Sequence, residues 1–267
     1  MGILTRTRKQ HGFTIIEVTL VMAVTGLMII GLLVGINSSV NNQRYRDSVL
    51  TLRNDVQSLY DQVDSVRNER DNNWSCDSSA QTSQGGLTID RGQSSCQMLG
   101  RLMTISDSAI TKHSIIGYGV VPDGTSASDL TILNTFNFGN VPSMTETDRL
   151  EWGTKIAWAK TGVDASTIGS RNLAILVIRS PKSGQVYTFT SDALPTSASG
   201  RPSSAYIKSL LVDGSVIPGR KERVVCVESN GLIGRSNMAI TLAARANGTS
   251  AVESRTNESM EGMSTEC

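Results

Sequence analysis

The stretch GFTIIEVTLVMAVTGLMIIGLLVGI, residues 12–36, decides how this chain begins. From Val18 to Ile36 it runs for 19 residues without a charge, and about 20 such residues let a helix cross the hydrocarbon core of a bilayer. Glu17 stands at the head of this run. An ionised group deep in a bilayer costs about 2.5–3.5 kcal/mol, so a carboxylate retained at this place indicates a specific task.

The residues on either side of the apolar run predict its orientation. Arg6, Arg8 and Lys9 precede it, and a basic cluster of this kind keeps its own side of a span in the cytoplasm. Residues beyond Ile36 are then outside. An ordinary secretory signal peptide is the alternative, but no convincing small-residue cleavage site follows the run.

The cysteines agree with an external location. Four are present, none in a C-x-x-C pair, and every one lies beyond the apolar run: Cys76, Cys96, Cys226 and Cys267. An even number outside the cytoplasm suits disulfides, whereas structural zinc is not indicated. The simplest pairing by proximity joins Cys76 to Cys96 and Cys226 to Cys267, although four cysteines allow three pairings.

The helical pattern continues past the apolar run in a different style. Apolar residues recur at spacings of three and four, with charged residues between them: Val49, Leu52, Val56, Leu59, Val63 and Val66. This spacing predicts an amphipathic helix with one apolar face. We expect one helix from Phe13 to about Asn72, with an apolar half at 13–36 and an amphipathic half at 37–72. The second half would dock on a globular domain; a coiled-coil dimer is the weaker alternative, because the repeat is short.

The remaining residues, 73–267, indicate a β-rich globular domain, so the fold class is α+β. Residues 73–100 are predicted to form a loop pinned by Cys76 and Cys96. Strands are expected at 114–121, 130–138, 155–159, 173–179, 185–190, 223–228 and 238–243. Residues 206–212 fit a short helix or a strand, and 194–204 fit a surface loop. The polar tail after Arg245 would be disordered but for a tie from Cys267 to Cys226.

The N-terminal motif resembles that of the type IV pilin and pseudopilin family. The carrying residues are a basic leader, 1–12, followed by Gly12-Phe13-Thr14-Ile15-Ile16-Glu17 and the apolar run. The resemblance implies a pilin fold, cleavage after Gly12 by a prepilin peptidase and N-methylation of Phe13. It also implies that Glu17, fifth in the mature chain, pairs with the amine of Phe13 on an adjacent subunit during assembly.

Two further features bear on the kind of pilin. Many major pilins carry a proline inside the first helix, and this chain has none between Phe13 and Asn72, which favours a minor pilin or pseudopilin. The segments 223–235 and 238–242 are similar to the end of the minor pseudopilin H and FimT-like group, where a strand, a turn with Gly and Arg, and a second strand recur.

The sequence offers no enzyme site and no cofactor motif. Its two histidines, His11 and His113, lie far apart, and no nucleophile motif, phosphate loop or EF-hand pattern occurs. Asp71, Asp77 and Asp90 could contribute to a calcium site, but their spacing fits solvated loop carboxylates better. Without residues 1–12, 22 of the 25 basic side chains remain against 24 acidic ones, a net charge of −2 that gives no field to attract nucleic acid.

The leading hypothesis is a structural subunit of a type IV pilus or related pseudopilus. It would be a single-pass protein of the cytoplasmic membrane, processed by prepilin peptidase and then polymerised with other pilin subunits. A tip-located binding module, an adhesin or DNA receptor, is the second hypothesis. It rests on a basic bias in the C-terminal third: Arg201, Lys208, Arg220, Lys221, Arg223, Arg235 and Arg245. The third is a signal-anchored protein that is never processed. Whether a pilus, type II secretion or DNA uptake is served stays open.

Overall fold

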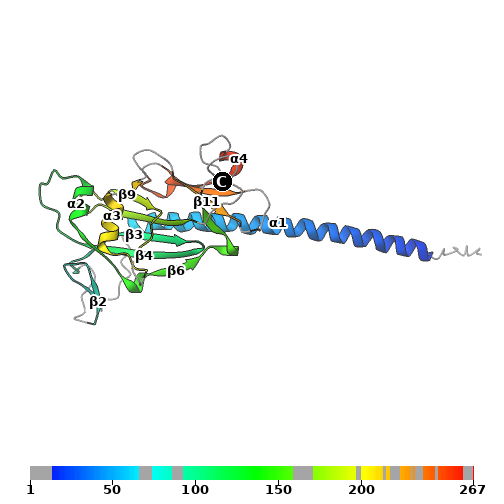
Figure 1. Cartoon of the computed structure of the whole chain (residues 1–267), viewed down its shortest axis with the longest axis horizontal. Helices are drawn as coiled ribbons and strands as arrows, with labels where there is room; N and C mark the ends of the chain where they lie inside the picture. Colours follow the sequence, from blue (N-terminus) through cyan, green and yellow to red (C-terminus); the bar gives the residue numbers. More distant parts are fainter. Residues whose placement is uncertain are drawn as a thin grey trace, which may run out of the picture. The chain divides into compact units, whose positions relative to one another are not determined.

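A single helix, α1 (Ile15–Asp64), dominates the first part of the chain (Figure 1). The computed structural model describes residues 14–65, 74–85, 93–158, 171–196, 200–212, 215–216, 223–229, 231, 237–243, 246–260 and 267. With 50 residues, α1 is about 75 Å long at 1.5 Å per residue. It ends at Asp64, earlier than the predicted Asn72, although residues 66–73 lie outside the described part. Contacts divide the chain into an N-terminal unit, 1–43, and a globular unit, 44–267.

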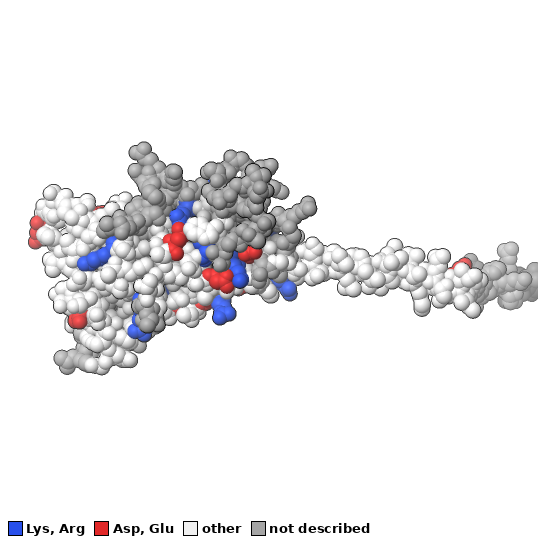
Figure 2. All heavy atoms as spheres, in the orientation of Figure 1, with Lys and Arg blue, Asp and Glu red and all other residues white. Residues whose placement is uncertain are grey.

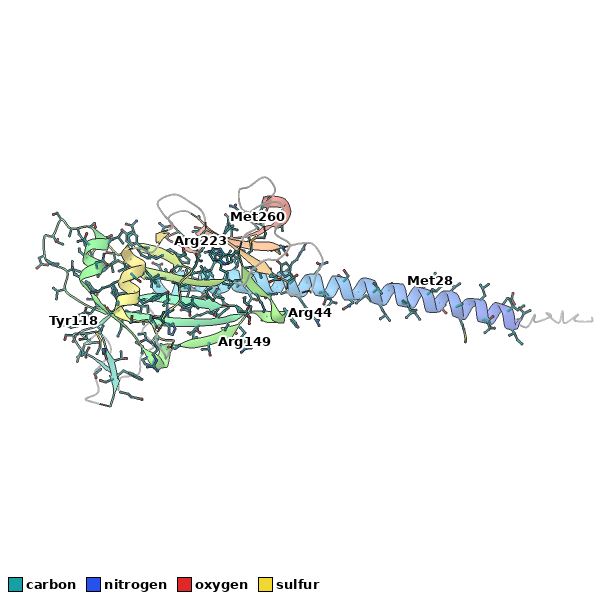
Figure 3. All side chains as sticks on the ribbon, viewed as in Figure 1. Met28, Arg44, Tyr118, Arg149, Arg223 and Met260 are labelled. Atoms are coloured by element: carbon teal, nitrogen blue, oxygen red, sulfur yellow. A yellow bond between two sulfur atoms is a disulfide. The ribbon has the colours of Figure 1, made fainter. Side chains whose placement is uncertain are left out.

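The described residues of the N-terminal unit, 14–43, form no packed core of their own. Its large apolar side chains between Ile15 and Ile36 are 43–84% exposed, and nothing lies within 4 Å of Cβ positions built at its three helix glycines. Side chains project all round this half of the helix, Met28 among them (Figure 3). On the face that Figure 2 shows, the only charged group of this half is a carboxylate near its start, and Glu17 is the one charged residue in 14–43. By length and composition, α1 can cross a membrane.

The globular unit contains two larger antiparallel sheets and a small hairpin. Seven strands of the described residues form the large sheet, in the order β10-β9-β8-β3-β4-β5, with β6 also paired to β4. These are β3 (Gln97–Ser106), β4 (Ala109–Tyr118), β5 (Asn137–Asn140), β6 (Glu146–Arg149), β8 (Asn172–Arg179), β9 (Val186–Ser191) and β10 (Ser215–Val216).

The small sheet has the order β13-β12-β11-β7. Its strands are β7 (Lys155–Ala157), β11 (Arg223–Glu228), β12 (Met238–Leu242) and β13 (Val252–Thr256). The hairpin pairs β1 (Trp74–Cys76) with β2 (Thr82–Gln84). Short helices complete the unit: α2 (Asp129–Thr135), α3 (Ser204–Val212), α4 (Asn257–Met260) and the 3-10 turns η1 (Pro142–Met144), η2 (Glu151–Gly153) and η4 (Thr249–Ala251).

The apolar face of the second half of α1 forms the main core. The predicted apolar residues from Val49 to Val63 are at most 4% exposed, which confirms the amphipathic helix; Val66 lies outside the described residues. They pack with side chains of both sheets, such as Ile175 of β8 and Ile240 of β12. A second core, with α2 and α3, includes Leu102 and Leu176 from the central strands of the large sheet. The large sheet therefore has apolar packing on both faces.

Polar contacts fix the beginning of the docked half of α1. The Tyr45 hydroxyl donates to the carbonyl of Val227 at 2.6 Å and accepts from the N–H of Met238 at 2.6 Å. The Ser48 and Thr154 hydroxyls are 2.6 Å apart, and both residues are fully buried. Through these bonds, the first turns of this half are attached to the small sheet and to the turn η2.

Several predicted strands are confirmed by the structure. Strands were expected at 155–159, 173–179, 185–190, 223–228 and 238–243, and they correspond to β7, β8, β9, β11 and β12. The strand predicted from Ser114 is present, but β4 begins five residues earlier and ends at Tyr118. The ambiguous segment 206–212 is helical, as part of α3.

Other predictions were wrong. Residues 130–138 were expected to form one strand because they contain several β-branched residues, yet they form α2 followed by the start of β5. The Ser128 side chain caps α2 by accepting from the N–H of Thr131 at 3.2 Å, and Ile132 and Leu133 pack into the second core. Tertiary packing thus overrides the local β preference.

Two segments predicted to be irregular also carry regular structure. The expected loop 73–100 contains the hairpin β1–β2 and the first residues of β3. The polar tail after Arg245 was expected to be ordered only through a tie from Cys267 to Cys226; that disulfide is present, and the tail also includes η4, β13 and α4. In the tail, β13 pairs along its whole length with β12, which supplies the backbone hydrogen bonds that its polar sequence does not reveal. In the loop 194–204, Ser204 belongs to α3.

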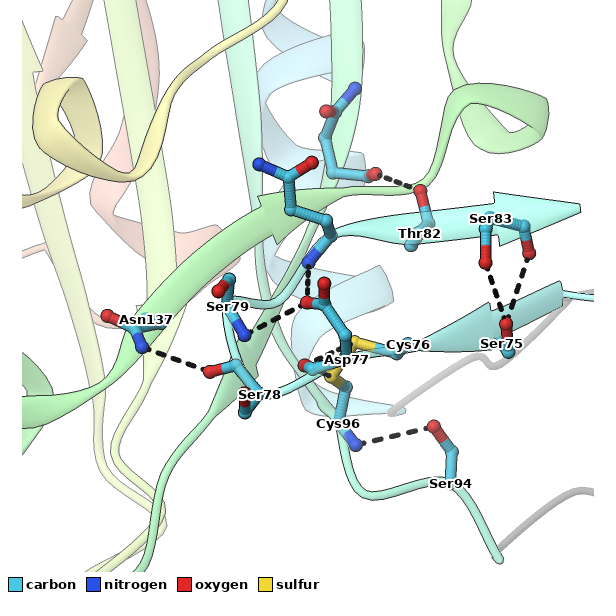
Figure 4. The surroundings of a disulfide bond; sticks show 12 residues. Ser75, Cys76, Asp77, Ser78, Ser79, Thr82, Ser83, Ser94, Cys96 and Asn137 are labelled. Atoms are coloured by element: carbon cyan, nitrogen blue, oxygen red, sulfur yellow. Dashed lines mark hydrogen bonds between the residues drawn. A yellow bond between two sulfur atoms is a disulfide. The ribbon is translucent and has the colours of Figure 1, made fainter.

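Both disulfides of the structure lie in the globular unit. One joins Cys76 to Cys96 and the other joins Cys226 to Cys267. Next to the first, the Asp77 side chain accepts from the backbone N–H groups of Ser79 and Gln81 at 2.9 and 2.8 Å (Figure 4). The carboxylate of Asp77 therefore serves a turn.

Candidate assembly segment at the helix N-terminus

A reciprocal pair of hydrogen bonds closes the first turn of α1. The Glu17 carboxylate accepts from the backbone N–H of Thr14 at 2.9 Å and from its hydroxyl at 3.0 Å. In return, the N–H of Glu17 donates to the Thr14 hydroxyl oxygen at 3.3 Å. This is a capping box, in which the cap residue and the third helical residue satisfy each other's free N–H groups. Glu17 thus has a local role in the subunit itself.

The remainder of the segment is an apolar surface that no other described residue of the chain covers. Its side chains stay exposed on every side, so water, lipid or other protein must cover them. Contact with water is unfavourable, because burying apolar surface stabilises a protein by about 25 cal/mol of free energy per Å², and surface left in water does not contribute this stabilisation. A helix that is apolar all round is typical of a membrane span or of a helix buried among others.

The structure describes some of the predicted site residues and not others. Gly12 and Phe13, the predicted cleavage and methylation positions, lie outside the described residues. Glu17 lies in the first turn of α1. For the considered calcium site, Asp77 is described and caps a turn, whereas Asp71 and Asp90 lie outside the described part.

The predicted basic residues are only partly described. Arg201, Lys208 and Arg223 are described; the other four lie outside the described residues: Arg220, Lys221, Arg235 and Arg245. Arg223 does not act as a free surface charge, because its guanidinium contacts both oxygens of the Asp192 carboxylate at 2.6 Å.

Asp192 joins two arginines from different parts of the globular unit. It accepts from Nε and Nη2 of the buried Arg171 at 2.9 and 2.8 Å, as well as from Arg223. Burial disfavours the charged carboxylate, but the hydrogen bonds from Arg223 and Arg171 outweigh it and hold the pKa of Asp192 below its ordinary value. Arg171 also donates to the carbonyl of Val224, so the cluster links the region before β8, the end of β9 and β11. Its evident role is structural.

His113 is buried in β4 and lies 3.4 Å by its Nδ1 from the Thr145 hydroxyl. Burial first, and the positive charge of Arg201 second, lower its pKa to about 4. The ring is therefore neutral near neutral pH. A neutral, buried imidazole of this kind acts as a packing residue.

Sequence reasoning missed two residues of the helix and its surroundings. The T-x-x-E spacing of Thr14 and Glu17 is itself a capping-box signature, and it could have been found. Trp152 could not: it has φ 57° and ψ 21°, a left-handed conformation that costs about 1–3 kcal/mol for a non-glycine residue. Its ring lies over the Arg44 guanidinium, 4.6 Å from centroid to Cζ.

Comparison with known families identifies the N-terminal segment. Residues 7–33 match the model of the prokaryotic N-terminal methylation motif. No curated protein and no solved structure matches the chain. The matched motif is the signature of type IV pilins and pseudopilins, and it indicates a structural protein rather than an enzyme. With α1 it indicates a prepilin-type, membrane-anchored chain, and it implies processing by prepilin peptidase and assembly with other pilins.

Proposed function

We propose that the chain is a minor subunit of a type IV pilus or pseudopilus. In this proposal prepilin peptidase cleaves after Gly12, the new amine of Phe13 is methylated, and residues 13–36 form the segment through which subunits polymerise. Before assembly the same segment spans the cytoplasmic membrane once, with the globular unit outside. The missing helix proline supports a minor rather than a major subunit.

One observation carries the proposal: an apolar half of α1, exposed on every side, begins inside a methylation motif. The motif covers residues 7–33, and the exposed apolar side chains continue to Ile36. A surface of this size calls for a lipid or helix environment, and a processed pilin meets both in turn. Two disulfides in the globular unit support its location outside the cytoplasm.

The capping box adds detail to the proposed role of Glu17. In the single subunit the carboxylate already accepts two hydrogen bonds from Thr14. During assembly we propose that it pairs with the Phe13 amine of an adjacent subunit. A carboxylate buried among helices needs such a cation, because an unpaired buried charge is costly.

The test is peptide mass spectrometry on filaments sheared from the cell surface and on membranes. A peptide that begins at N-methylated Phe13, found at low abundance in the filaments, is the expected result. High abundance there would show a major subunit instead. An intact Met1 leader in every fraction would favour the signal-anchored alternative and refute the proposal.

A further inference from the structure

The side chain of Trp152 is held in a strained and half-exposed position in the globular unit. We propose that Trp152, backed by Arg44, is a contact site for the globular part of a neighbouring subunit in the filament. This inference rests on the proposed function and adds a specific interface residue to it.

The backbone at Trp152 favours a smaller residue. With φ 57° and ψ 21° it lies in the left-handed region, where glycine fits without a steric penalty and a bulky side chain is an outlier. Despite this strain, the position carries a tryptophan with 50% of its surface exposed. Backbone strain that is retained in a folded protein clusters at functional sites.

Packing among the described residues does not account for the tryptophan. The ring contacts Arg44, whose guanidinium Cζ lies 4.6 Å from the ring centroid. A partly buried core tryptophan would gain from covering most of its ring, whereas this one leaves half of its surface to solvent. The side chain therefore offers apolar area that the subunit itself does not use.

The turn presents the ring rigidly. Thr154, two residues after Trp152, is fully buried, donates to the carbonyl of Glu151 at 2.9 Å and contacts the Ser48 hydroxyl at 2.6 Å. The first bond closes the turn across Trp152, and the second attaches its C-terminal side to α1. A side chain held on such a turn loses little conformational freedom when a partner binds it.

A neighbouring subunit is the partner that these features fit. Tryptophan and arginine are the residues most enriched at the energetic centres of protein interfaces. Arg44 follows Ile36 by only eight residues in the sequence, so the chain itself keeps Arg44 near the segment proposed to polymerise. A subunit that associates along residues 13–36 is thereby brought close to Arg44 and to the ring stacked on it.

The experiment uses the full chain in cells that assemble the filament. A photo-crosslinking amino acid is placed at position 152, and adducts from sheared filaments are identified by mass spectrometry. We expect an adduct with a chain that carries the methylation motif. In parallel, Trp152→Gly should reduce incorporation into filaments about tenfold, while its thermal unfolding midpoint in detergent stays at or above that of wild type. Trp152→Phe should retain part of the incorporation.

Trp158→Ala is the matched control. Trp158 is 46% exposed, and the Arg171 guanidinium Cζ lies 4.3 Å from its ring centroid, so its replacement removes a ring and a cation contact similar to those of Trp152. Its backbone, unlike that of Trp152, is not left-handed. This variant should assemble normally. The inference would be overturned if the Trp152→Gly chain entered filaments as efficiently as wild type. It would also be overturned if that variant had a lowered unfolding midpoint, or if residue 152 formed an adduct only with a protein that lacks the methylation motif. A wild-type chain that is uncleaved and absent from filaments would instead refute the proposed function.

Discussion

The hydroxyl of Tyr45 accepts a 2.6 Å hydrogen bond from the backbone N–H of Met238. It donates at 2.6 Å to the carbonyl of Val227, the residue that faces Met238 across the β11–β12 pair. Burial raises the pKa of Tyr45 to about 12, so the hydroxyl stays protonated and can make both bonds at physiological pH. One side chain of the helix thus bridges the end of a strand pair.

Replacing Tyr45 by Phe should lower the free energy of unfolding by about 1–3 kcal/mol. The change leaves the Val227 carbonyl and the Met238 N–H buried without their partner, and an unsatisfied buried group carries that penalty. Chemical unfolding of the full chain in detergent measures the loss. Tyr187→Phe is the control, because that hydroxyl bonds Asp129 and Gln185 near the surface and should contribute less. Equal losses in both variants would contradict the bridging role.

Lys112 of β4 forms an ion pair of 2.6 Å with Asp55 of α1, and their side chains are only 9% and 18% exposed. Lys112→Met should destabilise the fold by about 3–5 kcal/mol, since it strands a largely buried carboxylate. The double variant with Asp55→Leu should recover most of this loss. Unfolding curves of wild type, Lys112→Met, Asp55→Leu and the double variant form a double-mutant cycle. A double variant as unstable as Lys112→Met alone would argue against the pair.

His113 should make stability depend on pH between about 6.5 and 4. Its pKa is about 4 in the folded chain and near 6.5 when unfolded, so within this range the unfolded chain binds the additional proton. Stability therefore decreases as the pH falls through this window. Unfolding of His113→Gln across the window should show a smaller decrease than wild type. Parallel pH profiles for the two proteins would rule out this assignment.

Asp192 should make stability depend on pH in a more acidic range than His113 does. Because its folded pKa lies below the ordinary value, its stabilising effect is present above the unfolded pKa and disappears as the pH falls through the folded pKa. Asp192→Asn should therefore be less stable than wild type at neutral pH, with a difference that narrows in acid below about pH 4. A difference that persists unchanged to pH 2 would show that packing, not charge, is responsible.

Local patterns predicted the parts of the fold that depend on local physics. The spacing of Val49, Leu52 and Val56 predicted the buried face of α1, and the uncharged run from Val18 predicted its apolar half. The T-x-x-E capping box at Thr14 and Glu17 was equally local, although it was overlooked.

Features set by distant contacts could not be predicted in this way. The Tyr45 hydroxyl forms hydrogen bonds with backbone groups 182 and 193 residues away. Every residue has such backbone groups, so the sequence gives no sign of which ones are the partners. The turn that carries Trp152 is joined to α1 by a contact between Thr154 and Ser48, 106 residues apart. Residues 130–138 formed α2 and part of β5 because packing against the second core outweighed their β preference.

The order of the strands in the sequence also determines when the contacts of the helix can form during synthesis. β7 belongs to the small sheet and pairs with β11, yet the chain first returns to the large sheet through β8, β9 and β10. Because the chain is synthesised from its N-terminus, the partners of Tyr45 and of β7, which lie beyond residue 222, are made after both of them. The Tyr45 bonds between the helix and the small sheet therefore form only after Val227 and Met238 have been made. A product truncated before Val227 lacks these two bonds and keeps only the earlier attachments of the helix, such as the contact between Ser48 and Thr154.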